Sequence, residues 1–119
     1  MPAIGFVAPL LPGTTQVDRD AMNSCWTGER NAAYEDSRRR AGITRETTWI
    51  QTTPMGDMAV VVMEADDIEA ALGVIATSDE PFDQWFQEHV KKVHGISLAE
   101  GFPPPEMILN YRADAAGLA

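Results

Sequence analysis

The sequence predicts a single α+β domain whose elements follow the order strand, helix, strand, strand, helix, strand. Short apolar runs that end at proline or glycine are typical of strands. Other segments repeat apolar residues at intervals of three and four, which is the pattern of a helix with one buried face. A chain of 119 residues is long enough to bury one hydrophobic core, so one domain is expected.

The first part of the chain predicts a strand and a long helix. Residues 4–11, IGFVAPLL, form an apolar run that ends at a Pro-Gly pair, so a buried strand is expected there. The helix begins at Thr14 or Thr15, either of which can cap it, and it ends at Gly42. Gly28 lies inside this helix and is expected to kink it. The apolar stripe of the helix consists of Val17, Ala21, Met22, Cys25, Trp26, Ala32 and Ala33.

The rest of the chain predicts a hairpin, two helical segments and a last strand. Residues 44–53 are rich in threonine, residues 58–64 are apolar, and the four residues between them form a turn. The later elements are helices over 68–77 and 82–94 and a strand over 106–112. This order contains two split β-α-β units, which is the ferredoxin-like pattern with a four-stranded antiparallel sheet. The domain is expected to cover 1–112, followed by a flexible tail over 113–119.

The second strand of the hairpin predicts how the protein assembles. Residues 58–63, MAVVVM, lack the alternation of apolar and polar residues expected of a strand with one exposed face. A ferredoxin-like sheet has helices on one face only, so its other face needs cover. We predict a homodimer in which two copies pack sheet against sheet. The alternative is a monomer in which a ligand or a loop covers the second face.

The charge and cysteine content exclude several classes of partner and site. Nine basic and eighteen acidic side chains give a net charge of −9, which disfavours binding to nucleic acid and to anionic membranes. No apolar run is long enough for a membrane helix, and the apolar start lacks the basic segment of a signal peptide, so a cytoplasmic location is expected. The single cysteine, Cys25, permits neither an intrachain disulfide nor a zinc site with several cysteines of one chain.

The element order, with apolar residues 58–63 followed by Glu64-Ala65-Asp66-Asp67 before a helix, resembles the dimeric α+β barrel superfamily. That superfamily includes the antibiotic-biosynthesis-type monooxygenases, and residues 78–96, SDEPFDQWFQEHVKKVHGI, resemble an uncharacterised bacterial branch near them. The resemblance spans about 4–112 and rests on architecture. It implies a dimer with a small-molecule cavity between the sheet and its helices.

His89 is the candidate catalytic residue because it lies in the middle of the apolar stripe of the helix over 82–94. A histidine there is either a packed, hydrogen-bonded core residue or a side chain that points into a cavity as an acid/base or an axial haem ligand. Haem-degrading members of the superfamily combine such a histidine with an asparagine on the first strand and a nearby tryptophan. Residues 4–11 contain no asparagine, which argues against haem chemistry.

Aromatic and polar residues elsewhere predict a ligand pocket. The expected ligand-binding residues are Trp26, Trp49, Gln51, Trp85 and Asn110. Ordinary core and dimer packing is the alternative for these side chains. Glu29, Asp36 and Arg40 are expected on one side of the first helix, where they are either solvated or form the polar wall of a cavity or a dimer contact.

Three functions are compatible with these residues. The first is binding of a small organic molecule in an aromatic-lined cavity. The second is a cofactor-independent monooxygenase or an isomerase-like enzyme with His89 as acid/base. The third is a structural or interaction module whose dimer surface is its function. The sequence has no GxGxxG, P-loop, HExxH or GxSxG motif, so no cofactor, metal or serine-hydrolase chemistry is predicted.

Overall fold

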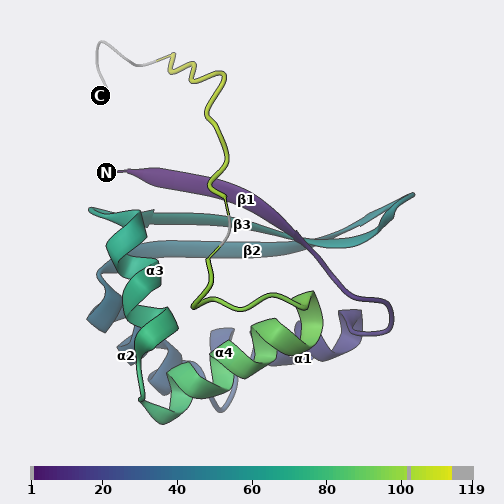
Figure 1. The fold of residues 1–119 in the computed structure, drawn as a ribbon, viewed down its shortest axis with the longest axis vertical. Coiled ribbons are helices and arrows are strands. Elements are labelled where there is room, and N and C mark those ends of the chain that lie inside the picture. Colours follow the sequence, from purple (N-terminus) through teal and green to yellow (C-terminus); the bar gives the residue numbers. More distant parts are fainter. Residues whose placement is uncertain (1, 102, 114–119) are drawn as a thin grey trace.

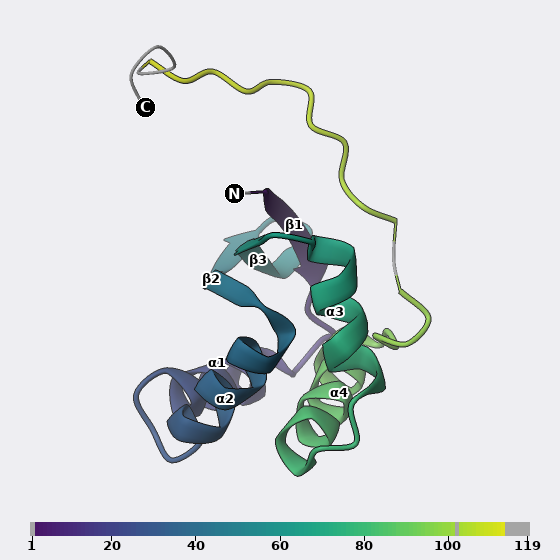
Figure 2. The same ribbon diagram turned by 90° about the vertical axis from the view of Figure 1, so that its left-hand side faces the viewer.

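The computed structural model describes residues 2–101 and 103–113. The elements in chain order are β1 (Ala3–Pro9), α1 (Thr15–Trp26), α2 (Asn31–Ala41), β2 (Ile43–Thr53), β3 (Gly56–Ala65), α3 (Ile68–Thr77) and α4 (Pro81–His94). Figures 1 and 2 show that the helices gather on one side of the sheet and leave its other side without helices. None of the helices in the described ranges combines the length and the apolar composition of a membrane span.

The sheet has the strand order β1-β3-β2, and both pairings are antiparallel. β3 is central because it forms a hairpin with β2 on one edge and pairs with β1 on the other. In this register Val61 pairs with both Phe6 and Thr48. Directly paired residues project to the same face of a sheet, so these three side chains form a row on the face that the helices cover.

The predicted ferredoxin-like fold with a four-stranded sheet is wrong, because the described residues form three strands and residues 106–112 are not one of them. This segment extends beyond the sheet, on the side away from the helices (Figure 1). Its apolar side chains are Met107, Ile108, Leu109 and Tyr111, which are 68–87% exposed. Residues 106–112 have strand-forming side chains, but these do not suffice to form a strand, because a strand also needs the hydrogen-bonding edge of a neighbouring strand. The prolines at 103–105 lack the N–H groups that such pairing uses.

The predicted long first helix is two helices, α1 and α2, separated by residues 27–30. The chain turns sharply at Gly28, where a Cβ atom would lie 2.7 Å from the Cα atom of Ser24. The Asn31 side chain then donates hydrogen bonds to the carbonyl oxygens of Cys25 and Trp26, at 3.0 and 2.9 Å. These bonds satisfy carbonyl groups at the end of α1 that have no partner within the helix. Gly28 therefore ends a helix instead of kinking one.

The predicted hairpin and the helices of the second half are confirmed. At the hairpin turn, the Thr53 hydroxyl donates to the carbonyl oxygen of Gly56 at 2.7 Å and accepts from the Met55 amide at 3.1 Å. Asp67 caps α3 by accepting a hydrogen bond from the Ala70 amide at 3.0 Å. Gly95 ends α4 in the left-handed conformation, with φ of 71°, which suits glycine.

The hydrophobic core lies between the sheet and the helices. Alternate residues of β3 are buried on the inner face, and helices α3 and α4 cover them. The central buried residues are Ile43, Val61, Met63, Ala65, Ala71 and Ile75, and α4 adds Val90 and Val93. Burying a side chain of this size contributes about 1.5–3 kcal/mol to folding, so this layer holds the helices on the sheet.

The outer face of the sheet is also apolar at its centre. Val60 and Val62 of β3 are half-buried there, beside Val7, which is 62% exposed, and Trp49, which is 50% exposed. No helix or loop of the described chain covers these side chains (Figure 2). The lack of alternation in residues 58–63 therefore corresponds to one face buried by helices and one left open in the single chain.

Candidate functional site

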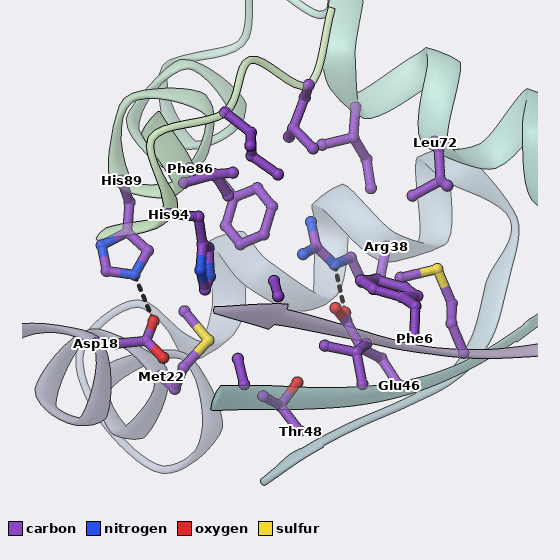
Figure 3. Close-up of a pocket in the computed structure, with 18 residues that line it drawn as sticks. Phe6, Asp18, Met22, Arg38, Glu46, Thr48, Leu72, Phe86, His89 and His94 are labelled. Carbon is purple, nitrogen blue, oxygen red and sulfur yellow. Dashed lines mark hydrogen bonds and ion pairs between the residues drawn. The ribbon is translucent and has the colours of Figure 1, made fainter. Parts of the chain in front are cut away.

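A cavity of about 80 Å³ lies between the inner face of the sheet and the helices. Its walls are mainly apolar, as in most sites that bind small molecules. The apolar side chains around it include Phe6, Met22, Val61, Leu72, Phe86 and Val90, and Figure 3 shows how they surround the space. Phe6 and Val61 of the wall come from the paired strands β1 and β3, and the other apolar side chains come from α1, α3 and α4.

Four of the polar side chains at the cavity form two pairs, and Thr48 and His94 also line it (Figure 3). Asp18 of α1 pairs with His89 of α4, and Arg38 of α2 pairs with Glu46 of β2. The first pair joins residues 71 positions apart, whereas the second joins α2 to β2, which follows it in the chain. The two pairs therefore help to fix the helices around the cavity as well as giving it polar groups.

Asp18 and His89 are almost completely buried, with 2% and 6% of their surfaces exposed. His89 Nε2 lies 2.8 Å from Asp18 Oδ1. Because a carboxylate oxygen only accepts hydrogen bonds, Nε2 donates, and Nδ1 of a neutral imidazole is left as an acceptor. Trp85 stacks on the His89 ring with 5.4 Å between ring centroids, and the Arg30 guanidinium lies 4.1 Å from the centroid of the Trp85 ring. His89 is thus held from two sides.

The second oxygen of Asp18 has no partner. Asp18 Oδ2 is buried and accepts no hydrogen bond from any described residue. Figure 3 shows this oxygen on the side of Met22, which lines the cavity with it. A buried polar atom without a hydrogen bond costs about 1–3 kcal/mol, and a charged group costs more. A hydrogen-bond donor that reached this oxygen would remove this cost.

Arg38 and Glu46 form the second polar pair and are largely buried. Arg38 Nε donates to Glu46 Oε1 at 2.7 Å, and the Tyr34 hydroxyl donates to the same oxygen at 2.7 Å. The Arg38 guanidinium packs against the rings of Tyr34 and Phe86, at 4.8 and 4.5 Å from their centroids. Burial lowers the pKa of Arg38, but the charge of Glu46 outweighs it and raises this pKa overall. Burial and the same charge raise the pKa of Tyr34.

A second hollow of about 440 Å³ adjoins the cavity. The two spaces share the side chains of Met22, Arg38, Glu46, Thr48 and Phe86. The hollow is also lined by Trp26 and by Cys25, whose thiol has a raised pKa because it is buried. The two spaces are therefore neighbours with one wall in common.

The structure brings only some of the predicted site residues together. His89 lines the cavity, and Trp85 stacks on it but lines the groove between α1 and α4 instead. Trp26, which is 75% exposed, borders the adjoining hollow. Trp49 lies on the outer face of the sheet, as does Gln51, two residues further along β2. Asn110 is exposed in the C-terminal segment. The binding roles of these last three residues stay predictions.

Sequence reasoning missed Asp18, Arg38 and Glu46. A signal existed for Asp18, because it precedes Ala21, Met22 and Cys25 by three, four and seven positions and so lies on their apolar stripe. A carboxylate at such a position has to find a partner or a ligand. No pattern in the sequence singled out Arg38 as a cavity residue. An arginine in the last turn of a helix is already explained by its favourable interaction with the helix end.

The expected cluster of Glu29, Asp36 and Arg40 does not line the cavity. The side chains of Glu29 and Asp36 are 82% and 54% exposed. The expected pairing of Asp36 with Arg40 is confirmed, with 2.9 Å between Arg40 Nε and Asp36 Oδ2. Arg40 Nη1 also donates to buried Asp83 at 2.9 Å, and the Ser37 hydroxyl donates to the other Asp83 oxygen. This cluster joins α2 to α4.

Hydrogen bonds set the acidity of Asp83. Burial raises the pKa of its carboxyl, but hydrogen bonds from Ser37, Ser78 and Arg40, with the charge of Arg40, outweigh burial and lower this pKa. Within the described ranges, no three His, Cys, Asp or Glu side chains gather in a way that would hold a metal ion.

Comparison with known proteins leaves the resemblance to the dimeric α+β barrel superfamily a prediction. No protein-family model, no curated protein and no solved structure matches the chain.

Proposed function

We propose that the protein binds a small, mainly apolar organic molecule in the cavity between sheet and helices, and that the molecule carries a hydrogen-bond donor. The observation that supports this proposal is the buried Oδ2 atom of Asp18, which has no partner among the described residues and belongs to a side chain in a mainly apolar wall. A hydroxyl or amine group of the ligand would donate to this oxygen. The rest of the ligand would contact apolar side chains such as Met22 and Phe86.

A bound water molecule is the simplest competitor for the Asp18 oxygen. A buried water typically makes about three hydrogen bonds. The polar side chains of the wall could bind such a water, but they would leave the larger apolar part of the lining unfilled. An amphipathic ligand satisfies the oxygen and fills the apolar space at the same time, so it suits this lining better than water does.

Two probe molecules of similar shape test the proposal. Phenol carries a donor and toluene does not, and each is added while the melting temperature of the protein is recorded. We expect phenol to raise the melting temperature of the wild-type protein more than toluene does. In Asp18→Asn an amide replaces the carboxylate, so the preference for phenol should disappear. Asp66→Asn, which changes an exposed carboxylate outside the cavity, is the matched control. Equal effects of the two probes on the wild-type protein would refute the proposal.

An enzyme is the second candidate function, and the Asp18–His89 pair favours it. A histidine held by a carboxylate is a common arrangement for proton transfer. An isomerase-like reaction suits such a pair better than the monooxygenase alternative, because it needs only the movement of a proton.

We also propose that two copies pair through the outer face of the sheet. Exposed Val7 and Trp49, with Val60 and Val62 between them, support this proposal. Val7→Lys should lower the fraction of dimer measured by sedimentation, whereas Val74→Lys, at an exposed position on α3, should not. A wild-type protein that sediments as a monomer would contradict the pairing.

A further inference from the structure

We propose that Asp18 is a general base that removes a proton from a carbon acid bound in the cavity, and that His89 is its positioning residue. This inference rests on the proposed ligand site, because the same Asp18 oxygen serves both. The substrate class is a small apolar carbonyl compound with an acidic C–H bond beside its carbonyl group.

The geometry of Asp18 is that of a base held ready in an apolar space. His89 fixes Oδ1 at 2.8 Å, while Oδ2 lies on the Met22 side and has no competing partner among the described residues (Figure 3). Only 2% of Asp18 is exposed, so bulk water does not solvate its charge. A positioned carboxylate whose hydration shell has been replaced by protein takes a proton more readily than one in water.

His89 connects the cavity with the solvent. Asp18 lines the cavity, whereas His89 lines both the cavity and a more open groove between α1 and α4. Ser24, Arg30 and Trp85 form part of this groove. Because Nε2 is bound to Asp18, Nδ1 is the nitrogen that remains to exchange a proton with the groove. The imidazole of His89 therefore lies between buried Asp18 and the groove.

The proposed reaction balances without a co-reactant. The C–H bond breaks, its proton forms an O–H bond with Asp18 Oδ2, and the electron pair moves onto the carbonyl oxygen to give an enolate. Thr48 and Arg38 line the same cavity, and their O–H and N–H groups are the donors available to that oxygen. When the proton returns to a different carbon, the carboxylate is restored and the product is an isomer of the substrate.

A carbon acid that needs only a base provides the test. In nitrobenzisoxazole, removal of the ring C–H proton breaks the N–O bond, and the electron pairs form a nitrile and a coloured phenolate. We expect the protein to produce the phenolate faster than the same concentration of acetate does. Asp18→Asn should lower kcat at least about 100-fold, the usual contribution of a general base. Asp66→Asn should leave the rate unchanged.

The role of His89 is tested by a conservative rescue. His89→Leu removes the donor to Asp18, and it should lower kcat with little change in KM. His89→Gln provides an amide donor in its place and should recover part of kcat. A structural role alone would predict equal rates for the two variants whenever both are folded, as judged by circular dichroism.

The outcomes separate this inference from the proposed ligand site. If wild-type protein prefers phenol to toluene but does not accelerate the reaction beyond acetate, the base is refuted and the ligand site stands. If neither effect occurs, both proposals fail. If Asp18→Asn does not fold, the wild-type protein is tested for competition between phenol and nitrobenzisoxazole. Phenol must inhibit the reaction if both compounds bind at Asp18. A reaction that phenol leaves unchanged would overturn the assignment.

Discussion

Two aspartates occupy equivalent places in their helices but differ in what surrounds them. Asp18 lies in the first turn of α1, Asp83 lies in the first turn of α4, and both are buried. Both Asp83 oxygens accept hydrogen bonds, one from Ser37 and one from Arg40. Only one Asp18 oxygen has a partner. Asp83 therefore has the full set of partners expected of a structural residue. Asp18 has one acceptor oxygen, Oδ2, that no described residue uses.

Asp83→Ala is the change with the largest expected effect on stability. It leaves the Ser37 hydroxyl buried without its acceptor and removes one carboxylate partner of Arg40. We expect the free energy of unfolding in urea to fall by about 2–4 kcal/mol. Asp36→Ala, which removes the exposed partner of Arg40, should cost less than about 1 kcal/mol. Similar losses in the two variants would mean that burial of Asp83 contributes nothing.

The second-largest expected effect is that of acid on the cluster of Ser37, Asp83 and Arg40. The pKa of Asp83 is lower in the folded protein than its ordinary value, so the unfolded chain binds more protons in the acid range. The contribution of Asp83 is therefore fully present above the unfolded value of about 3.9 and is lost as the pH falls through the folded value. Urea unfolding at several pH values below 5 should show a steeper acid loss for the wild type than for Asp83→Asn. Parallel curves would contradict this expectation.

Asp18→Asn should have the smallest effect on stability. The amide oxygen still accepts from His89 Nε2, and the unpaired charged oxygen is replaced by a neutral group. We expect the free energy of unfolding to change by less than about 1 kcal/mol. The weaker hydrogen bond from His89 to a neutral amide and the relief of burying an unpaired charge have opposite signs and nearly cancel. A loss as large as that of Asp83→Ala would show that Asp18 is structural and would remove the basis of the ligand site.

Local patterns in the sequence predicted the hairpin, α3, α4 and the position of His89 on an apolar stripe. The last strand could not be predicted in this way, because residues 106–112 have strand-forming side chains but the pairing edge is a property of the whole fold. The end of α1 depends on the contact of Gly28 with Ser24, which helical periodicity does not reveal.

The candidate site was predictable only in part for a related reason. His89 and Trp85 belong to one helix, so their spacing shows that they are neighbours. The partner of His89 is 71 positions away, and only the packing of α1 on α4 reveals it. Trp49 and Gln51 were placed in the predicted pocket because strand periodicity gives alternating faces without showing which face the helices cover.

The exposed C-terminal segment, residues 103–113, is a site where a protease is expected to cut the chain. Residues 103–113 belong to no helix or strand, and none of them belongs to the buried core or lines the cavity. Limited proteolysis favours such exposed segments over packed helices. A fragment that ends at Gly101 keeps all seven helices and strands, both polar pairs and the outer face of the sheet. Trimming this segment would therefore yield a smaller protein in which the cavity chemistry can be studied on its own.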